Sequence, residues 1–230
     1  MENHMQETQS MYRNINKCLN CKIRSKIFCD KLNEDCLDQI SKEVRHENLP
    51  KGSIVLSQND EIFNIFNIIH GIIKVYQINE NGDEQIIGFL YPGDFFGSHE
   101  GGRYEFYAES ITPVKLCKIP IKEFRKYLSL NKELHDSFYV AVMNELKLAR
   151  MQINILAKYS AEEKVLDFLK MISMKQVGHG QPENPINLQM TRSDIANYLG
   201  LKIETVSRAI TKLRVKNIIN INENGLLMLN

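Results

Sequence analysis

Four short segments rich in β-branched and aromatic residues occupy positions 51–120, and glycine-containing turns punctuate them. The segments are SIVLSQ, FNIIHGIIKVYQI, EQIIGFLYPG and YAESITPVKLCKIP, and the turn signals NENGDE and PGDFFG fall among them. NENGDE is typical of a β-hairpin turn. Several short strands at this spacing predict a small antiparallel barrel or roll.

Helical patterns flank the β region, so the chain is expected to be α+β. Leu32, Cys36, Ile40 and Val44 recur every four residues, which predicts a short helix over 31–46 with Cys36 on its core face. Positions 121–173 are also expected to be helical. Positions 175–189 have no periodicity and contain Gly, Pro and Asn, so they are expected to form a linker or surface loop.

Two apolar stripes follow the second half of that helical region. One is a coiled-coil seam with steps of four and three residues, formed by Val142, Leu146, Ala149, Ile153 and Leu156. The other consists of Leu148, Met151 and Ile155. One stripe can pack on the chain's own domain and the other on a partner. The seam spans about two heptads, so a single wide core face remains an alternative.

The C-terminal stretch MTRSDIANYLGLKIETVSRAITKLRVKNII predicts a helix-turn-helix. Thr191 is the expected N-cap of a first helix, with Asp194 three residues later, and Gly200 permits the tight turn. Lys202 stands at the N-cap of the second helix, although lysine cannot cap. The expected core residues are Ile195, Ala196, Leu199, Leu201, Val206, Ile210 and Leu213. The ending IININENGLLML predicts a hairpin wing.

The exposed face of the second helix carries side chains that contact base edges in the major groove of DNA. Glu204, Ser207 and Arg208 lie near its N-terminus, the end that enters the groove, and Lys212 follows one turn later. From Asn187 onward six Lys or Arg oppose three acids, a local charge of +3 in a chain whose net charge is only +1. Thr191 and Arg192 complete the expected DNA-binding set. The alternative is a small helical domain with a solvated charged face.

Three of the five cysteines lie within CLNCKIRSKIFC, from Cys18 to Cys29, whereas Cys117 stands alone in PVKLCKIP. The N-terminus lacks a signal-peptide pattern, and the most apolar runs are too short and interrupted for a membrane helix. A cytoplasmic location is therefore expected, where a disulfide framework is improbable. A cysteine cluster in that compartment indicates metal or redox chemistry.

Essentially the whole chain resembles the Crp/Fnr family of bacterial transcription regulators, and it is most similar to the Fnr branch of oxygen sensors. MTRSDIANYLGLKIETVSR, GDEQIIGF with PGDFFG, AEEKVL and VKLCKIP carry the resemblance. It implies a cyclic-nucleotide-binding-like β-roll, a long dimerisation helix and a winged helix-turn-helix. The corresponding divisions are 1–30 for a cysteine-bearing arm, 31–130 for the roll, 131–158 for the helix and 159–230 for the DNA-binding domain.

The resemblance also implies a [4Fe-4S] cluster held by Cys18, Cys21, Cys29 and Cys117, with Cys36 as a weaker candidate. Four thiolates are the ordinary ligand set of such a cluster. The implied regulator senses oxygen, or nitric oxide, and binds TTGAT…ATCAA-like inverted repeats as a homodimer. Gly82 and Asp83 match a roll loop that contacts RNA polymerase in the family. The expected dimerisation residues are Val142, Leu146, Ala149, Met151, Ile153 and Leu156. Met151 stands where Fnr proteins commonly have an acidic residue, which implies more residual dimer in the cluster-free protein.

Other uses of the thiols and of the roll stay open. The same sulfurs could bind zinc, although structural zinc sites usually show two close pairs, or they could form a thiol–disulfide switch or be inert. In the Crp branch, which binds a cyclic nucleotide in the roll, Gly-Glu and Arg-Ser or Arg-Thr pairs hold the ligand, whereas this chain has Gly97-Ser98 and Tyr104-Glu105 at the matching positions. Arg103 could still hold a small anion. No combination of nucleophile, base and orienting residue is visible, so an enzyme is not expected.

Overall fold

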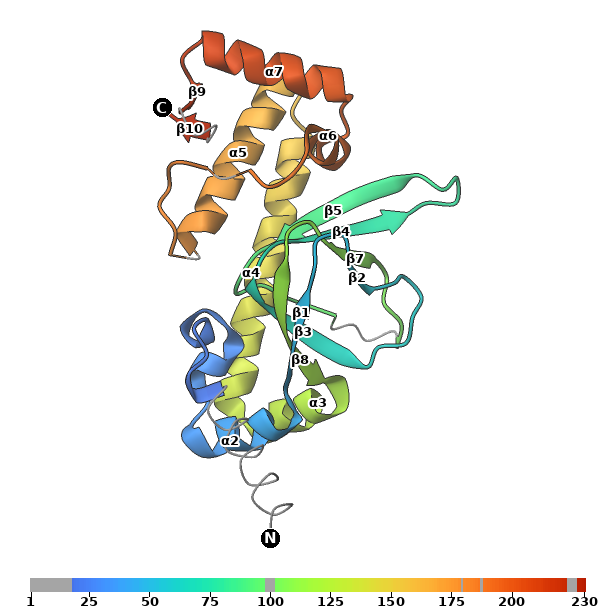
Figure 1. The fold of residues 1–230 in the computed structure, drawn as a ribbon, viewed down its shortest axis with the longest axis vertical. Helices are drawn as coiled ribbons and strands as arrows, with labels where there is room; N and C mark the ends of the chain where they lie inside the picture. Colours follow the sequence, from blue (N-terminus) through green and yellow to red (C-terminus); the bar gives the residue numbers. More distant parts are fainter. Residues whose placement is uncertain (1–17, 98–101, 179, 187, 223–226) are drawn as a thin grey trace.

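Two antiparallel four-stranded sheets form the centre of the computed structural model, which describes residues 18–97, 102–178, 180–186, 188–222 and 227–230. Their strand orders are β1-β8-β3-β6 and β2-β7-β4-β5. The strands are β1 (Arg45–Leu49), β2 (Ile54–Leu56), β3 (Asn64–His70), β4 (Ile73–Ile78), β5 (Glu84–Leu90), β6 (Phe95–Phe96), β7 (Tyr107–Ser110) and β8 (Val114–Pro120). The sheets form the expected roll, and the fold class is α+β (Figure 1).

Turns with glycine in the left-handed region connect these strands. Gly71 joins β3 to β4 with φ of +86°, and a Cβ there would collide with the carbonyl of Pro113. The β4–β5 hairpin closes through Gly82, whose φ is +85° and whose N–H donates to the carbonyl of Asn79. The sequence NENGDE therefore forms the turn that its composition predicts.

Helices surround the roll and follow it. They are the 3₁₀ turns η1 (Arg24–Lys26) and η2 (Phe28–Lys31), and the helices α2 (Glu34–Glu43), α3 (Ile121–Leu130), α4 (Lys132–Leu156), α5 (Ala161–Gly178), α6 (Arg192–Leu199) and α7 (Ile203–Val215). A short hairpin of β9 (Ile219–Ile221) and β10 (Leu227–Leu229) follows. The helical region expected over 121–173 is thus three helices. The side chain of Asn131 caps α4 by accepting a hydrogen bond from the N–H of Leu134.

The last turn of α5 extends into residues 175–189, which were expected to form a linker. Lys175, in this last turn, is held in place because its Nζ donates to the carbonyl of Phe89 at 2.9 Å and contacts Asp94 at 3.2 Å. These contacts come from a part of the chain far away in sequence. Local composition therefore could not indicate that the helix continues to Gly178.

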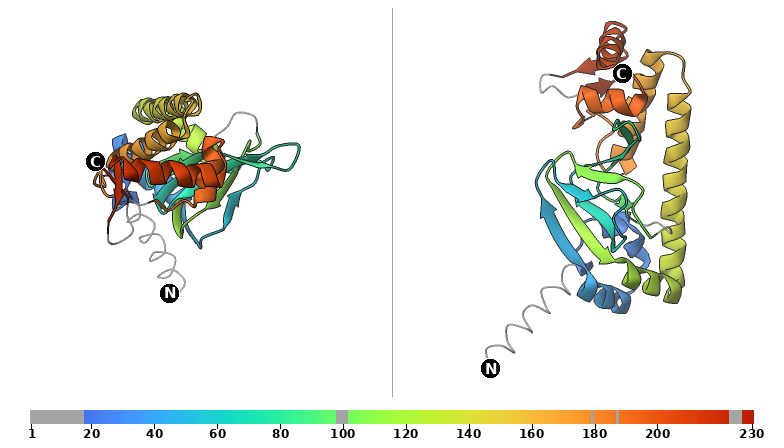
Figure 2. Two further views of the ribbon diagram at one scale, coloured as in Figure 1. Left: turned by 90° about the horizontal axis from the view of Figure 1, so that it is seen from above. Right: turned by 90° about the vertical axis from the view of Figure 1, so that its right-hand side faces the viewer.

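The long helix α4 runs along one side of the molecule (Figure 2). Its two apolar stripes have different surroundings. Ile155 is buried, and Met151 packs against the core of its own chain. The residues of the expected seam do not belong to this core, and Val142 lines a groove beside the roll. The seam residues Val142, Leu146, Ala149, Ile153 and Leu156 are all exposed to solvent.

Three apolar clusters make up the core, and the largest spans both the roll and the C-terminal helices. In that cluster the ring of Tyr198 on α6 lies 5.4 Å from Phe89 of β5 and 5.4 Å from Phe168 of α5. Within the described residues, none of the helices combines the length and apolar character needed to cross a membrane.

Candidate functional sites

The helix-turn-helix is built from α6, the turn at Gly200 and α7. Thr191 Oγ1 accepts a hydrogen bond from the N–H of Asp194 at 3.1 Å, and the Asp194 carboxylate accepts from the N–H of Thr191 at 2.8 Å. This is a complete capping box. Gly200 has φ of 62°, and Lys202 occupies the N-cap of α7 without a side-chain cap, so packing alone starts that helix. All the expected core residues are buried except Leu201, which is half-buried.

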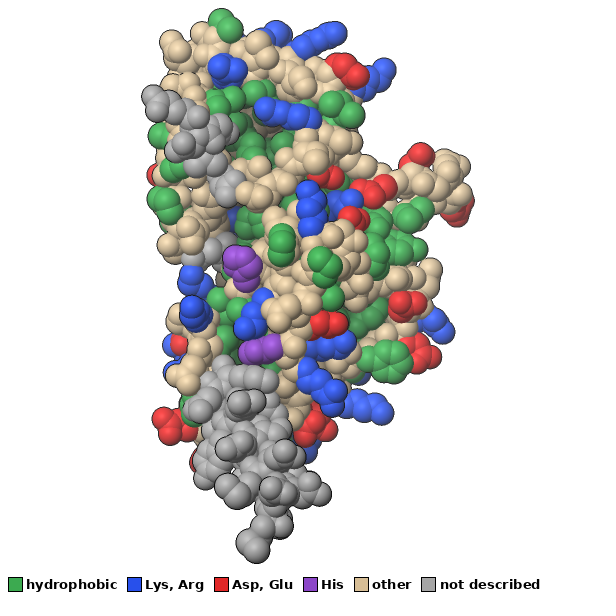
Figure 3. Space-filling model, viewed as in Figure 1, with side chains coloured by type: hydrophobic (Ala, Val, Ile, Leu, Met, Phe, Trp, Pro, Cys, Tyr) green, Lys and Arg blue, Asp and Glu red, His purple; other side chains and the backbone are tan. Residues whose placement is uncertain are grey.

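One face of α7 presents the expected DNA-contacting side chains to solvent. Glu204, Ser207, Arg208 and Lys212 are all exposed, and so are Thr191 and Arg192 at the start of α6. Figure 3 shows Lys and Arg side chains over α7 at one end of the molecule. The β9–β10 hairpin follows α7, and its expected Glu-Asn-Gly turn lies outside the described residues.

Glu162, on the first turn of α5, binds two lysines of the helix-turn-helix. Lys212 Nζ lies 2.9 Å from Glu162 Oε1, and Lys216 Nζ contacts Oε2. Hydrogen bonds from Lys216 and Lys212 hold the pKa of Glu162 below its ordinary value. No sequence pattern indicates this pairing, because helix packing alone brings α5 beside α7. The ammonium of Lys212 is therefore shared between Glu162 and any phosphate that approaches.

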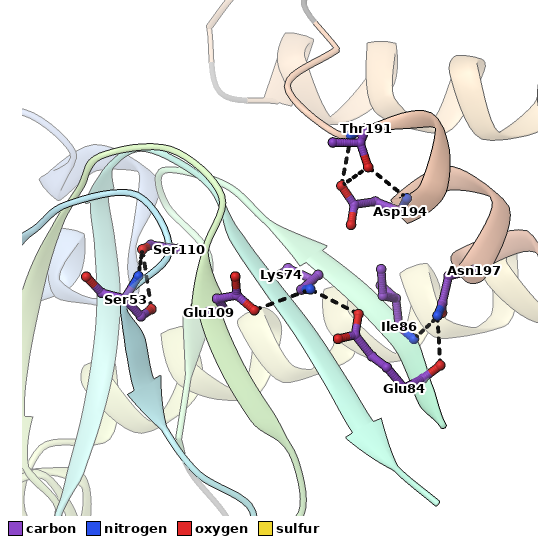
Figure 4. A network of polar contacts seen from close by, with 9 residues as sticks. All are labelled: Ser53, Lys74, Glu84, Ile86, Glu109, Ser110, Thr191, Asp194 and Asn197. Atoms are coloured by element: carbon purple, nitrogen blue, oxygen red, sulfur yellow. Dashed lines mark hydrogen bonds and ion pairs between the residues drawn. The ribbon is translucent and has the colours of Figure 1, made fainter. Parts of the chain in front are cut away.

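Polar contacts fasten α6 to the edge of the roll (Figure 4). The Asn197 side chain accepts a hydrogen bond from the N–H of Ile86 at 2.6 Å and donates one to the carbonyl of Glu84 at 2.7 Å. Gln85 donates to the Asn197 carbonyl at 3.1 Å. The Glu84 carboxylate pairs in turn with the buried Lys74 at 2.9 Å. The helix-turn-helix is thus joined directly to strand β5.

The cysteine-bearing segment folds against the roll and α4. Phe28, on η2, packs its ring 5.1 Å from Phe124, 6.0 Å from Phe95 and 5.6 Å from Phe138 of α4. This aromatic cluster brings Cys29 into the same core as Cys117 on β8. Phe28 therefore links the cysteine segment to the long helix.

Four cysteines line one small cavity in this region: Cys18, Cys21, Cys29 and Cys117. None of the four forms a disulfide with another described residue, and Cys29 and Cys117 are buried. Burial raises the pKa of both buried thiols, and the neighbouring cysteines raise it further. Cys29 and Cys117 consequently favour the protonated form in this conformation, and metal binding would have to release their protons.

The cavity is tight. Its volume is about 20 Å³, roughly enough for one water molecule. In this conformation no three His, Cys, Asp or Glu side chains among the described residues are arranged to hold a metal ion. The donor set nevertheless fits a thiolate-bound metal group, because four sulfurs gather where the other lining is mainly apolar.

Cys36 lies apart from this cavity. It is half-buried on α2, packs against the same core and accepts a weak hydrogen bond from Asn131 Nδ2 at 3.4 Å. Arg24 and His46 also line the cavity, and sequence reasoning missed both of them. His46 stands directly opposite Cys117 in the β1–β8 ladder, a register that no local pattern indicates.

The described residues around Arg103 do not form a positively charged site for a nucleotide phosphate. The Arg103 guanidinium donates to the carbonyl of Asn59, and Tyr104 is buried with its hydroxyl donating to the carbonyl of Asn64. Ser98 lies outside the described residues. A groove of about 1030 Å³ lies between the roll and the helices α3 and α4, and Arg125 and Glu145 are its charged lining residues. Gly82 and Asp83 are exposed at the tip of the β4–β5 hairpin.

Comparison with known proteins agrees with this architecture. Residues 46–131 match the family model of the cyclic nucleotide-binding domain, and residues 188–219 match that of bacterial regulatory proteins, crp family. The structure of FixK2 from Bradyrhizobium japonicum superposes with a TM-score of 0.73 and 23% identity, covering 81% of this chain and 92% of that one.

Two curated relatives span nearly the whole chain. The nitrogen fixation regulation protein FixK of Bradyrhizobium diazoefficiens is 32% identical, covering 92% of this chain and 90% of its own length. The fumarate and nitrate reduction regulatory protein of Vibrio cholerae is 31% identical, covering 93% of this chain and 86% of its own length. The two identities are nearly equal, so overall similarity does not choose between these relatives.

Proposed function

This chain belongs to the Crp/Fnr family of DNA-binding transcription regulators, and we propose that it is an Fnr-type regulator whose four clustered cysteines bind a [4Fe-4S] cluster. The family consists of regulators, so the chain is not an enzyme. The observation that carries the proposal is the gathering of Cys18, Cys21, Cys29 and Cys117 around one mainly apolar cavity. Similarity to relatives named anaerobic regulatory protein supports an oxygen-linked signal.

The four cysteines of the cavity would hold the cluster from two separate parts of the chain. Cys18, Cys21 and Cys29 would hold the group from the N-terminal segment, and Cys117 would fix it to strand β8. When bound, a [4Fe-4S] cluster supplies a redox-active, oxygen-labile centre. Cys29 lies next to Phe28, whose ring contacts Phe138 on α4. Reorganisation of the cysteine segment therefore changes packing on the helix that carries the exposed apolar seam.

Dimerisation through the exposed seam of α4 would connect the cysteine segment to DNA binding. The exposed side chains of the seam give α4 an apolar face suited to a second copy of the chain, as in a homodimer. Two copies would present two α7 helices to an inverted repeat of the TTGAT…ATCAA type, with Glu204, Ser207 and Arg208 contacting bases. Thr191, Arg192 and Lys212 would add contacts, and Gly82 and Asp83 would face RNA polymerase.

The test is anaerobic purification followed by a visible spectrum and iron and sulfide analysis, before and after exposure to air. We expect about four iron and four sulfide per chain, with broad absorbance that air removes. Affinity for a TTGAT…ATCAA duplex should fall with the absorbance. A colourless protein with zinc, or one that only forms a disulfide in air, would contradict the cluster while leaving DNA binding intact.

Cysteine variants give the matched control. Cys29→Ser and Cys117→Ser each remove a sulfur from the cavity and should abolish iron retention. Cys36→Ser removes a half-buried thiol outside the cavity and should retain the spectrum and iron content of the wild type. Loss of iron in Cys36→Ser, with retention in Cys117→Ser, would overturn the assignment of the ligands.

A further inference from the structure

Asn67, on β3, buries an amide for which the described residues provide no hydrogen-bond partner. Its side chain has 0% exposure, and neither Oδ1 nor Nδ2 is bonded to another described residue. Folded proteins almost always satisfy such groups, because an unpaired buried amide loses its hydrogen bonds to water without compensation. An unpaired buried amide therefore needs an explanation. One explanation is that the amide forms its hydrogen bond only when a ligand is bound nearby.

The strand register places this amide beside Cys117. Asn67 is paired with Cys117 of β8 on one side and with Phe95 of β6 on the other. Side chains of directly paired residues lie on the same face of a sheet, with Cβ atoms about 4.5–5.5 Å apart. Ile65, two residues earlier and so on the same face, belongs to the cluster that contains Cys29 and Cys117. The amide is thus on the face that carries the sulfurs.

The neighbours leave few possible acceptors for the amide hydrogens. Ile65, Ile69 and Phe95 surround the position on its own face and are apolar. The sulfur of Cys117 is the paired polar side-chain atom across the ladder. A metal-bound thiolate is a negatively charged acceptor, so a hydrogen bond to it in dry surroundings is stronger than a neutral one.

We propose that Asn67 is a positioning residue for the sulfur site, whose Nδ2 donates a hydrogen bond to the metal-bound sulfur of Cys117. This inference rests on the proposed function. Donors to the ligand sulfurs of such sites stabilise negative charge and set the reduction potential. Asn67 therefore increases metal retention and raises the reduction potential, and the metal-free protein is destabilised by the unpaired amide.

The variant Asn67→Leu distinguishes this role from an ordinary packing role. If Asn67 positions the sulfur, the variant should stabilise the metal-free protein and weaken metal binding. Leucine has a similar size and no polar atoms, so the metal-free variant should unfold at a higher urea concentration than the wild type. The same variant should bind Co²⁺ more weakly, by on the order of tenfold, when followed anaerobically by thiolate-to-cobalt charge-transfer absorbance. After reconstitution with iron and sulfide, its midpoint potential should be lower than that of the wild type.

Asn64→Leu is the matched control, since Asn64 lies on the same strand with its side chain on the opposite face. It should change neither cobalt affinity nor potential. If Asn67→Leu and wild type had equal cobalt affinity and equal midpoint potential, the inference about Asn67 would be overturned and the proposed function would stand. A lower stability of metal-free Asn67→Leu would have the same meaning. A wild type that takes up neither cobalt nor iron and sulfide would overturn the proposed function as well.

If Asn67→Leu fails to fold, Asn67→Ser takes its place. Serine keeps one hydroxyl donor on a shorter side chain, so cobalt affinity should fall less than tenfold and the potential should move in the same direction. Wild-type values for both quantities in Asn67→Ser would contradict the role of the amide.

Discussion

A single carboxylate, Glu162, neutralises part of the positive charge on the helix-turn-helix. It binds Lys212 and Lys216, so neither ammonium is fully available to phosphate. Glu162→Gln should free both lysines and increase affinity for the inverted-repeat duplex several-fold at low salt. The slope of log affinity against log salt should steepen by about 0.9 for each additional phosphate that a lysine neutralises. Fluorescence anisotropy with labelled duplex at several salt concentrations measures both effects.

Glu163→Gln provides the control for this prediction. It makes the same charge change one residue along α5, where the described residues show no ion pair between this side chain and α7. Only the small effect of net charge is expected. Equal increases in affinity for Glu162→Gln and Glu163→Gln would show that the ion pairs with Lys212 and Lys216 are irrelevant to DNA binding.

At the scale of elements, the contact between α6 and β5 holds the DNA-binding domain against the roll. Asn197→Ala removes the side chain that bonds both Ile86 and Glu84, and it leaves a backbone N–H and a carbonyl unpaired. We expect a loss of about 1–3 kcal/mol of stability. The DNA-binding domain should also begin to unfold separately from the roll, because only the bond from Gln85 to the carbonyl of residue 197 would remain between α6 and β5. Differential scanning calorimetry would show one transition broadening or dividing into two.

Ser193→Ala tests the specificity of that effect. Ser193 lies on the exposed face of the same helix, and its substitution should leave the single transition nearly unchanged. A broadened transition in Ser193→Ala, or an unchanged one in Asn197→Ala, would show that the hydrogen bonds to β5 do not couple the two parts.

The elements differ in how far the sequence could predict them. The β4–β5 hairpin, the capping box at Thr191 and the turn at Gly200 depend on neighbouring residues, so local patterns were sufficient. The docking of α6 on β5 depends on surfaces distant in the chain. The end of α5 was misplaced for the same reason, since Lys175 is held by Phe89 and Asp94.

At the scale of the whole molecule, sequence resemblance named the cysteines but could not give their surroundings. The register that places His46 and Asn67 on either side of Cys117 is a property of the folded sheet. The ring contact between Phe28 and Phe138 likewise appears only when the segment packs on α4. These contacts join the cysteine segment to the helix that carries the exposed seam, and the resemblance alone does not reveal them.

The exposed seam of α4 should also affect whether the metal-free protein forms a dimer. Ile153 is 65% exposed in the single chain, whereas Met151 packs on the opposite side of α4 against its own core. Because all five seam residues are apolar and exposed, and none carries a charge that would repel a second copy, the metal-free protein should remain partly dimeric at micromolar concentration. Analytical ultracentrifugation measures this directly, and a clean monomer would contradict it.

Variants of α4 test whether the seam forms that dimer. Ile153→Asp would bury an unpaired carboxylate in the interface and should weaken association by on the order of a hundredfold. Asn154→Asp introduces the same charge at the next exposed position, about 100° around the helix and beyond the edge of the seam, so the dimer should persist. Because Ile153 is exposed in the monomer, its substitution should barely change the stability of the chain. A dimer that survives Ile153→Asp would place the contact between copies elsewhere on the molecule.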